Sequence, residues 1–301
     1  MENTLFLTSE QAEIIKKHYS SFIDERELAY VQWRIKVKET VITLYTSNKL
    51  VFQGKNWTLF YEEITSLLNI IPEVKSNFSD DLEDNMSTIG SDEVGIGDYF
   101  GPIIVCSCFV SKEKHVYLRS LNIKDSKKLS DSQINFLAPL IMNNTKYSVV
   151  SLNNETYNEI TNNQSINLNK IKAILHNRAL LNITKMKPPY EKIIIDAFTT
   201  KEHYFKYLES EKEVFLDINF VQKAEDKFLA VACSAIIARF HLINHFKEMS
   251  KNYNIVFPKG AGSPVDKVLE KILINRPEIL PKIAKINFAN TKKCKEKISL
   301  R

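Results

Sequence analysis

Glycine is scarce in this chain of 301 residues, and its distribution constrains the fold more than any other feature. The chain has seven glycines, and four of them, Gly90, Gly95, Gly97 and Gly101, fall within one stretch of a dozen residues. Glycine is favoured where the backbone takes a positive φ or lies close against another group. We therefore expect segment 90–102 to turn sharply and to lie against a ligand or another part of the chain.

Two acidic residues stand side by side in this segment, whose sequence is GSDEVGIGDYFGP. Asp92 and Glu93 fall at the end of a predicted strand, and the turn Gly95-Ile96-Gly97 follows directly. No Gly-Lys-Ser or Gly-Lys-Thr follows, so the segment is not a P-loop, and its glycine spacing is wrong for a dinucleotide fingerprint. The pattern instead predicts carboxylates beside a tight turn.

Other carboxylates occupy comparable positions. Asp196 ends the run Ile-Ile-Ile at 193–195, so it emerges at the carboxyl end of a strand, where open α/β sheets place their sites. Glu225 and Asp226 open an apolar helix, where the positive end of the helix dipole favours a negative charge. Taken singly, such acids are usually structural.

Taken together, the acids indicate a metal site. Several carboxylates that converge without histidine or cysteine offer only oxygen ligands, which suit Mg²⁺ or Mn²⁺. Two such ions about 4 Å apart can activate a water and stabilise the leaving oxygen of a phosphodiester.

Basic residues are available to bind phosphates, although each group has a plainer interpretation. The net charge is +5 and the pI is about 8.8, which is compatible with a nucleic-acid partner and does not establish one. The segment DSKKL at 125–129 is either a phosphate contact or a charged loop. The tail 290–301 holds five bases and one acid, so it is either a nucleic-acid contact or a solvated tail without fixed structure.

The composition also indicates the compartment. No run approaches the roughly 18 apolar residues that a membrane span requires, and the N-terminus MENTLFLTSEQ lacks a basic region typical of a secretory signal. Four scattered cysteines are too few for a disulfide framework. Cys106 and Cys108 lie in an apolar run, which favours buried thiols over a metal pair. We expect a cytoplasmic protein without a membrane partner.

An acidic segment divides the chain. Residues 76–87, SNFSDDLEDNMS, hold four acids and no base, which is typical of a linker. It separates residues 1–75 from residues 88–301. The first part predicts the order β-α-β-β-β-α: a strand at 4–7, a helix to about residue 22, strands at 30–38, 41–46 and 49–53, and a helix from about 57. Thr8 and Gln11 form a capping box at the first helix.

The second strand of this small α+β domain has one apolar and one basic face. Apolar residues alternate with Arg34, Lys36 and Lys38, as in a strand that buries one side. The basic side is either a solvated sheet face or a platform for an oligonucleotide. The first part of the chain has slightly more acid than base, so only the clustering favours the platform.

The second part alternates strands and helices, which predicts an α/β sandwich. We expect strands near 88–94, 102–110, 147–152, 192–196 and 213–221. Helices are expected near 130–143, 167–183, 200–209 and 225–249. The last helix is apolar all round over FLAVACSAIIARF at 228–240, so it should be buried.

These motifs resemble those of the type 2 ribonucleases H, and most of all those of bacterial ribonuclease HIII. GSDEVGIGDYFGP is similar to the family's first motif, DSKKL to its second, IIID at 193–196 to its third and KAEDKFLAVACSAIIAR at 223–239 to its fourth. PKGAG at 258–262 and INFANTKK at 286–293 resemble its C-terminal part. The resemblance runs from about residue 88 to 293 in the family's order, and the N-terminal part is similar to the family's TATA-binding-protein-like substrate domain.

The resemblance implies a ribonuclease H-like catalytic domain, a mixed sheet flanked by helices, with assigned site residues. The metal-binding catalytic acids would be Asp92, Glu93, Asp196 and Glu225. Ribose 2′-hydroxyls, which distinguish RNA from DNA, would meet the backbone of Gly95, Ile96 and Gly97, and phosphates would meet Ser126, Lys127 and Lys128. The chain departs from the family at Asn287, where a histidine is common, and at Asp226, where a small polar residue is usual. The spacing to AIIAR favours Glu225 over Asp226 as the fourth acid.

The implied activity is hydrolysis of the RNA strand of RNA–DNA hybrids by two Mg²⁺ or Mn²⁺ ions, leaving 5′-phosphate and 3′-hydroxyl ends. We expect a monomer. One alternative is ribonuclease HII-like incision at single ribonucleotides in DNA, against which the N-terminal domain and Glu225 argue. An alternative of another class is a non-catalytic hybrid-binding protein. Such a binder would gain nothing from a negative cluster beside phosphates.

Overall fold

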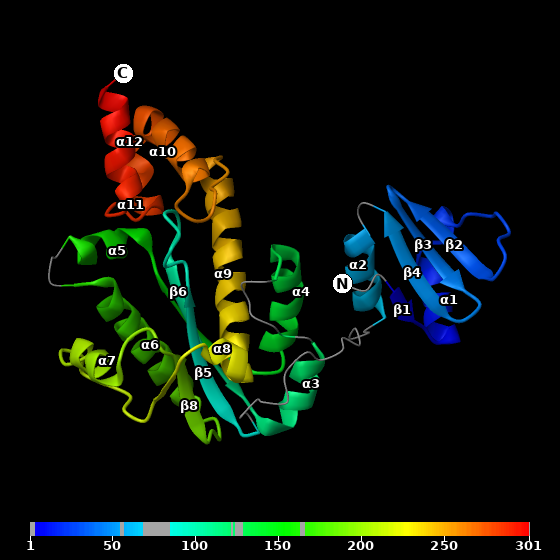
Figure 1. The fold of residues 1–301 in the computed structure, drawn as a ribbon, viewed down its shortest axis with the longest axis horizontal. Helices are drawn as coiled ribbons and strands as arrows, with labels where there is room; N and C mark the ends of the chain where they lie inside the picture. Colours follow the sequence, from blue (N-terminus) through cyan, green and yellow to red (C-terminus); the bar gives the residue numbers. More distant parts are fainter. Residues whose placement is uncertain are drawn as a thin grey trace. The chain divides into compact units, whose positions relative to one another are not determined.

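The computed structural model describes residues 4–54, 57–68, 85–121, 123, 129–162 and 166–300. It divides the chain into two compact units, Met1–Lys75 and Ser76–Arg301, which are drawn in Figure 1 and described separately here. Most of the expected linker 76–87 lies outside the described residues, as do Ser126, Lys127 and Lys128.

The N-terminal unit is an antiparallel sheet with two helices. The sheet has the strand order β1-β4-β3-β2. The predicted order of elements is confirmed, with a short 3-10 turn, η1, added after the first helix. The elements are β1 (Thr4–Phe6), α1 (Ser9–His18), η1 (Ser20–Phe22), β2 (Val31–Val37), β3 (Thr40–Tyr45), β4 (Lys49–Gly54) and α2 (Trp57–Leu67).

Alternation along β2 decides which face of this sheet is buried. Trp33 and Ile35 point into a core that also takes Ile15 from α1 and Ile64 from α2, so both helices cover the same face of the sheet. The expected capping box of Thr8 and Gln11 begins α1. In the described part of this unit no helix covers the opposite face of the sheet, which carries Arg34 and Lys36. Lys38, which was expected on the same strand face, instead lies in the turn after β2 with a φ of 50°.

The C-terminal unit is built on a mixed five-stranded sheet of order β7-β6-β5-β8-β9. Its central strand β5 pairs antiparallel with β6 and parallel with β8, so the predicted mixed α/β architecture is confirmed. The strands are β5 (Thr88–Val94), β6 (Ile103–Val110), β7 (Lys146–Leu152), β8 (Lys192–Asp196) and β9 (Asn219–Val221).

The strand predicted at 213–221 is correct only at its end. β9 covers three residues. Before it, the backbone of residues 213–215 bonds to a side chain rather than to a neighbouring strand: Asn177 Nδ2 donates to the Glu213 carbonyl at 2.7 Å and Phe215 N donates to Asn177 Oδ1 at 2.9 Å. The sequence of 213–218 has the composition of a strand, but its backbone groups are satisfied elsewhere.

Helices flank both faces of this sheet (Figure 1). Alternate residues of β8 face different helices. Ile193 and Ile195 share a core with α6 on one face of the sheet, and Ile194 packs with Val231 of α9 on the other. The helices are α3 (His115–Ser120), α4 (Asp131–Met142), α5 (Asn154–Thr161), α6 (Leu168–Thr184), α7 (Lys201–Tyr207), α8 (Ala224–Lys227), α9 (Leu229–Tyr253), α10 (Ser263–Asn275), α11 (Leu280–Ile283) and α12 (Ala289–Ser299), with 3-10 turns η2 (Lys112–Lys114) and η4 (Pro277–Ile279).

The long apolar helix predicted at 225–249 is two helices. Phe228 is extended, with φ −124° and ψ 120°, and separates α8 from α9. Its side chain is buried against Ile194 and Val231, which helps to explain the break. Within the described residues, α9 is the helix long and apolar enough to cross a membrane, yet 72% of its apolar window is buried inside the protein. It is the central helix of the core, as expected.

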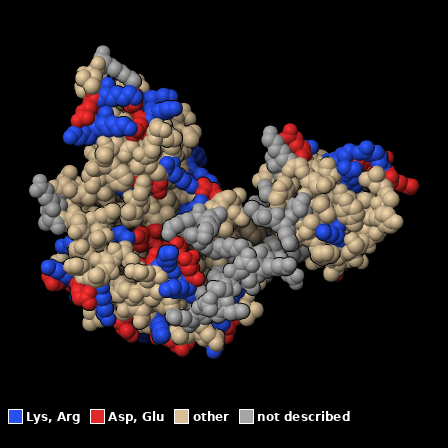
Figure 2. All heavy atoms as spheres, in the orientation of Figure 1, with Lys and Arg blue, Asp and Glu red and all other residues tan. Residues whose placement is uncertain are grey.

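Most of the basic tail forms the helix α12, so of its two alternative interpretations the tail without fixed structure is wrong. α12 packs on α10, where Lys293 Nζ lies 2.7 Å from Asp266 Oδ2 and Lys297 Nζ lies 2.5 Å from Glu270 Oε1. The Cys294 side chain is buried between them. Figure 2 shows Lys and Arg side chains gathered over these C-terminal helices. Sequence analysis missed this helix because salt-bridging and solvated lysines alternate along it in place of an apolar face.

Gly90 allows α9 to lie directly on β5. A Cβ atom at this position would meet the backbone nitrogen of Val231 at 2.2 Å and the Ala230 carbonyl carbon at 2.3 Å. Ser234 Oγ donates to the Gly90 carbonyl at 2.9 Å. Helix and strand are therefore in backbone contact just before the Asp-Glu pair.

We expect Gly90→Ala to lower the free energy of unfolding by about 3 kcal/mol, because the added methyl can be accommodated only by shifting backbone. Urea denaturation of both proteins measures this difference. Gly262→Ala is the matched control, since its Cβ would have only ordinary contact, 3.7 Å from Pro264 Cδ. A Gly90→Ala protein as stable as the control would contradict the close packing.

Candidate active site

Three elements bring four carboxylates to one edge of the sheet. Asp92 and Glu93 lie near the end of β5, and Asp196 ends β8. These strands are parallel, with Ser91 level with Ile195, so their next residues emerge at the same height. Glu225 lies in the first turn of α8, whose first amide, that of Ala224, donates to Asp196 Oδ1 at 3.0 Å.

Asp92 is the most strongly perturbed of the four acids. Its side chain is buried, with 9% exposed, and its Oδ1 accepts from the Glu93 amide at 2.7 Å. Burial raises the pKa of Asp92 well above its usual range, and the negative charges of Glu93, Glu225 and Asp196 raise this pKa further. A neighbouring charge shifts a pKa in this way only over a short distance. The structure therefore brings together all four acids that the sequence indicated.

Glu93 is held by two side chains of α6. Lys172 Nζ lies 2.5 Å from Glu93 Oε1, and His176 Nε2 lies 2.9 Å from Glu93 Oε2. Burial alone would raise the pKa of Glu93, but the hydrogen bonds and charges of His176 and Lys172 outweigh it and lower this pKa to about 2. Glu93 is therefore a carboxylate with a fixed orientation.

A chain of hydrogen bonds anchors His176 in turn. Because a carboxylate only accepts, Nε2 carries the hydrogen toward Glu93, and Nδ1 lies 2.8 Å from Ser91 Oγ, whose hydroxyl also donates to the Cys106 carbonyl at 3.2 Å. Ser107 Oγ donates to Ser91 Oγ at 2.9 Å. The imidazole also stacks on the ring of Phe198, with centroids 5.4 Å apart.

Lys172 and His176 were missed by sequence analysis. A usable signal was present: both lie on the helix 167–183, which was expected to pack on the sheet, and they are four residues apart. That spacing places them on one helix face. A lysine and a histidine on a helix face that packs against a sheet are unusual enough to indicate a buried polar partner.

Glu225 and Asp226 differ in burial. Glu225 is buried beside the other acids and contributes to the raised pKa of Asp92, whereas Asp226 is exposed. This difference favours Glu225 as the fourth acid, in agreement with its spacing to the AIIAR segment.

The two glycines of the turn after β5 have different environments. Gly95 is buried with a φ of +87°, and a Cβ there would lie 2.2 Å from the Pro102 carbonyl oxygen. Gly97 is exposed, and a Cβ there would meet nothing within 4 Å. Ile96, between them, is partly buried against the core formed by Ile103 and its neighbours. Gly95 is thus required by the turn itself, while Gly97 leaves room for a ligand.

The C-terminal segments of the chain support this turn. Lys285 is almost fully buried, and its Nζ donates to the carbonyls of Asp98 at 2.7 Å and Gly101 at 2.6 Å. Burial lowers the pKa of Lys285 to about 8, although the charge of Asp98 opposes the shift. The Gly260 amide donates to Asp98 Oδ1, and Asn154 Nδ2 donates to the Gly101 carbonyl at 2.9 Å.

The acids fit a divalent ion in chemistry and in charge. They supply only oxygen, the ligand that Mg²⁺ and Mn²⁺ prefer. Within the described part of the chain, no three histidine, cysteine, aspartate or glutamate side chains are already arranged around one point as metal ligands. Lys172 and His176 contact Glu93, and the Ala224 amide contacts Asp196. Each carboxylate oxygen has two lone pairs, so these contacts leave capacity for metal.

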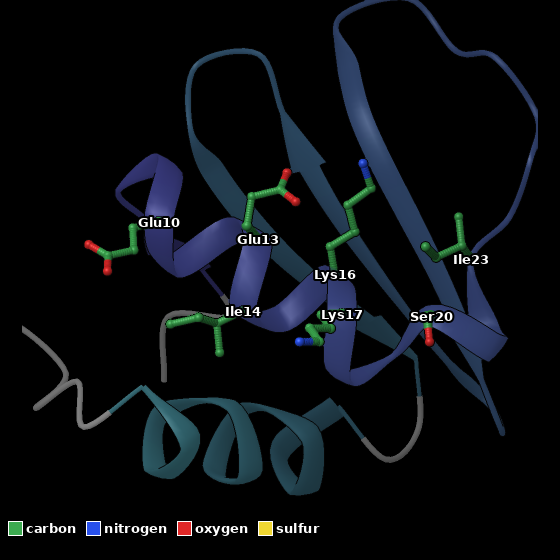
Figure 3. Close-up of a pocket in the computed structure, with 7 residues that line it drawn as sticks. All are labelled: Glu10, Glu13, Ile14, Lys16, Lys17, Ser20 and Ile23. Carbon is green, nitrogen blue, oxygen red and sulfur yellow. The ribbon is translucent and has the colours of Figure 1, made fainter.

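A surface hollow of about 550 Å³ lies in the N-terminal unit, along α1 (Figure 3). Its two acids lie on the first half of α1 and its two bases on the second half, and it lies in the unit that holds none of the four acids. Its mixed charges are those of a solvated helix face. It is lined by Glu10, Glu13, Ile14, Lys16, Lys17, Ser20 and Ile23.

Comparison with known proteins places both units in one family. The profile of the family described as "Ribonuclease HII" matches residues 89–291, and that of "Domain of unknown function (DUF3378)" matches residues 4–66. The chain is 41% identical over 286 residues to "Ribonuclease HIII" of Phytoplasma mali (strain AT), covering 93% of both chains. It is 35% identical to "Ribonuclease HIII" of Lactococcus lactis subsp. cremoris (strain SK11), covering 97% of this chain and 98% of the relative.

Solved structures agree with these matches. The structure titled "Crystal structure of Bst-RNase HIII in complex with Mn2+" has a TM-score of 0.69 and 32% identity, and the match covers 99% of both chains. Ribonuclease H2 from Pyrococcus horikoshii OT3 shares the fold alone, with 19% identity, a TM-score of 0.61 and coverage of 72% of this chain and 100% of that chain. The chain therefore belongs to the ribonuclease HII family and, by similarity along nearly its full length, to the ribonucleases HIII.

Proposed function

We propose that this chain is a metal-dependent endoribonuclease that hydrolyses the RNA strand of RNA–DNA hybrids. The observation that carries the proposal is the gathering of Asp92, Glu93, Asp196 and Glu225 at one sheet edge, where the other three acids raise the pKa of Asp92. A cluster of buried negative charge is unfavourable by itself, and a cation relieves it. The similarity to a ribonuclease HIII crystallised with Mn²⁺ supports a divalent ion here.

The four acids would divide the metal-binding role. Asp92 and Asp196 would bind most directly, and Glu93 and Glu225 would complete the site. Two Mg²⁺ or Mn²⁺ ions, when bound, supply Lewis acidity to the phosphodiester and lower the pKa of the attacking water. The products would carry 5′-phosphate and 3′-hydroxyl ends.

Recognition of RNA would fall to the turn after β5. The exposed backbone at Gly97 has the room to approach a ribose 2′-hydroxyl, the group by which a protein distinguishes RNA from DNA. Gly95 and Ile96 would shape that turn. Ser126, Lys127 and Lys128 would contact phosphates, a prediction that rests on sequence because these residues lie outside the described ones.

The N-terminal unit would bind the substrate through the open face of its sheet. Arg34 is the strongest candidate, because its Nε is buried and has no hydrogen-bond partner among the described residues. Lys36 Nζ already lies 3.2 Å from Asp24 Oδ2, so its charge is partly offset. Lys38, in the adjoining turn, is exposed.

We also propose that the protein acts as a monomer in the cytoplasm, without a membrane partner. Four free, buried cysteines support a reducing compartment. The sequence also raised two alternatives, incision at single ribonucleotides in DNA and hybrid binding without cleavage, and the similarity to ribonucleases argues against the second. A labelled hybrid and a duplex with one ribonucleotide, each incubated with the protein and Mg²⁺ or Mn²⁺, separate all three activities.

Asp92→Asn and Asp196→Asn should each reduce hybrid cleavage to below a few per cent of the wild-type rate, because each removes charge that the metal ions require. Hybrid binding, measured by fluorescence anisotropy, should persist. Glu225→Gln should be nearly as severe, with the exposed neighbour Asp226→Asn as its mild control. If Asp226→Asn proved the more damaging of the two, the fourth ligand would move by one position.

The two glycines of the turn should respond differently to valine. Gly97→Val should keep the wild-type melting temperature but cut hybrids at least about tenfold more slowly, because a branched side chain would hold the ribose away from the backbone. Gly95→Val should lower the melting temperature itself, since its side chain has no space. Calorimetry and single-turnover cleavage distinguish these outcomes. Normal cleavage by a folded Gly97→Val protein would argue against recognition at this turn.

Changing Arg34, Lys36 and Lys38 together to alanine should weaken hybrid binding in the full chain without altering the cleavage rate at saturating substrate. The dependence of log affinity on log salt should become shallower by about 0.9 for each phosphate that the protein no longer neutralises. Lys16 and Lys17 on α1, changed to alanine together, control for the loss of positive charge on the opposite side of the same sheet. Equal salt slopes for both variants and the wild type would contradict the platform.

A further inference from the structure

Two residues of α6, a lysine and a histidine, are buried against the acids of the site. Lys172 is 8% exposed and His176 is fully buried. They lie one helical turn apart, and each takes one oxygen of Glu93, at 2.5 Å and 2.9 Å. Lysine is almost never buried to this extent unless it is paired, so its presence on this helix face calls for a specific role.

The surroundings of Lys172 favour a cation. Its Nζ lies 4.0 Å from the centroid of the Phe198 ring, a position in which the negative face of the ring attracts an ammonium. Phe198 follows Asp196 by two residues, so the end of β8 and the loop after it bring an acid and an aromatic ring to the same region. Ammonium, ring face and carboxylate thus form one continuous contact.

Glu93 belongs to a group of acids that carries negative charge. Four carboxylates converge at the sheet edge, and the ammonium of Lys172 is in direct contact with one of them, Glu93. His176 Nδ1 lies 2.8 Å from Ser91 Oγ, which in turn accepts from Ser107 Oγ at 2.9 Å, so the orientation of the ring is fixed. The two side chains therefore differ in what holds them: Lys172 packs on an aromatic ring, and His176 is fixed by a chain of hydrogen bonds.

We propose that Lys172 is a resident counter-cation of the carboxylate site, which offsets its negative charge in the metal-free protein and opposes divalent ions there, while His176 fixes the orientation of Glu93. The inference rests on the proposed metal role of the four acids. Both residues are positioning residues, because they act through Glu93. The two roles have opposite consequences for metal binding.

Removing the lysine should strengthen metal binding. In Lys172→Met the repulsion between the ammonium and an incoming ion is absent, so Mn²⁺ affinity should rise on the order of tenfold at low ionic strength. The metal-free protein should melt at a lower temperature than the wild type, and the increase of melting temperature on addition of Mn²⁺ should be larger. Lys172→Arg, which keeps the charge, should bind Mn²⁺ nearly as the wild type does.

Disturbing the histidine should weaken metal binding. His176→Gln and Ser91→Ala each release the imidazole chain, so Mn²⁺ should bind less tightly and raise the melting temperature by less. Ser91→Ala is the milder change and leaves the contact between His176 and Glu93 in place. It tests the orientation even if His176→Gln does not fold.

The experiment is calorimetry of the full-length protein with and without Mn²⁺, together with titration of Mn²⁺ by electron paramagnetic resonance. Lys170→Met on the same helix is the matched control and should leave both measurements unchanged. A merely structural role would lower the metal-free melting temperature of each variant and leave the Mn²⁺-induced increase the same, which would overturn the proposal. If Lys172→Met folds only in Mn²⁺, the proposal is supported, and if it folds under neither condition, the proposal is wrong.

The same measurements separate this inference from the proposed function. If Mn²⁺ does not raise the melting temperature of the wild-type protein, or raises that of Asp92→Asn equally, the acids are not the metal site. If the wild type responds and Asp92→Asn does not, the site stands and the variants of Lys172 and His176 alone decide the inference.

Discussion

The parallel pairing of β5 with β8 is the constraint on which the rest of the site depends. Ser91 is level with Ile195, so the residues that follow them, Asp92 and Asp196, lie at the same height on the two strands. A shift of one residue would turn one of these acids to the other face of the sheet. The register is set by isoleucines that pack on α6 and α9 and by the bare backbone of Gly90 beneath α9. Ordinary core packing thus determines where the chemistry lies.

The proximity of the four acids is electrostatically unfavourable, and nearby residues offset part of the repulsion. Burial disfavours a charged carboxylate and like charges repel, and together these effects raise the pKa of Asp92. The first amide of α8 binds Asp196, and α6 supplies a lysine and a histidine to Glu93. These contacts hold the direction of the acids, and the ammonium of Lys172 offsets part of their charge. The site is therefore stable enough to fold and still attractive to cations.

Sequence analysis predicted the strands, the acids and the helices α1, α2, α4, α6, α7 and, as one helix, α8 with α9, because these follow from local patterns of apolar residues and from motifs. It did not predict α3, α5, α10 or α11. It failed where distant residues decide. The break at Phe228 depends on a pocket formed with Ile194, and the absence of strand at 213–215 depends on Asn177. α12 depends on acids of α10. Lys172 contacts Glu93 across a long stretch of the domain's sequence. Its spacing of four residues from His176 indicates a buried polar partner but does not identify that partner.

The position of Lys285 in the sequence determines when the turn after β5 gains its support. Its bonds to the carbonyls of Asp98 and Gly101 join residues 187 and 184 positions apart, and closing so long a loop costs conformational entropy. The strand that carries Asp92 is synthesised well before the lysine that supports the neighbouring turn. The turn can therefore reach its final shape only after residue 285 has been synthesised and has packed against it.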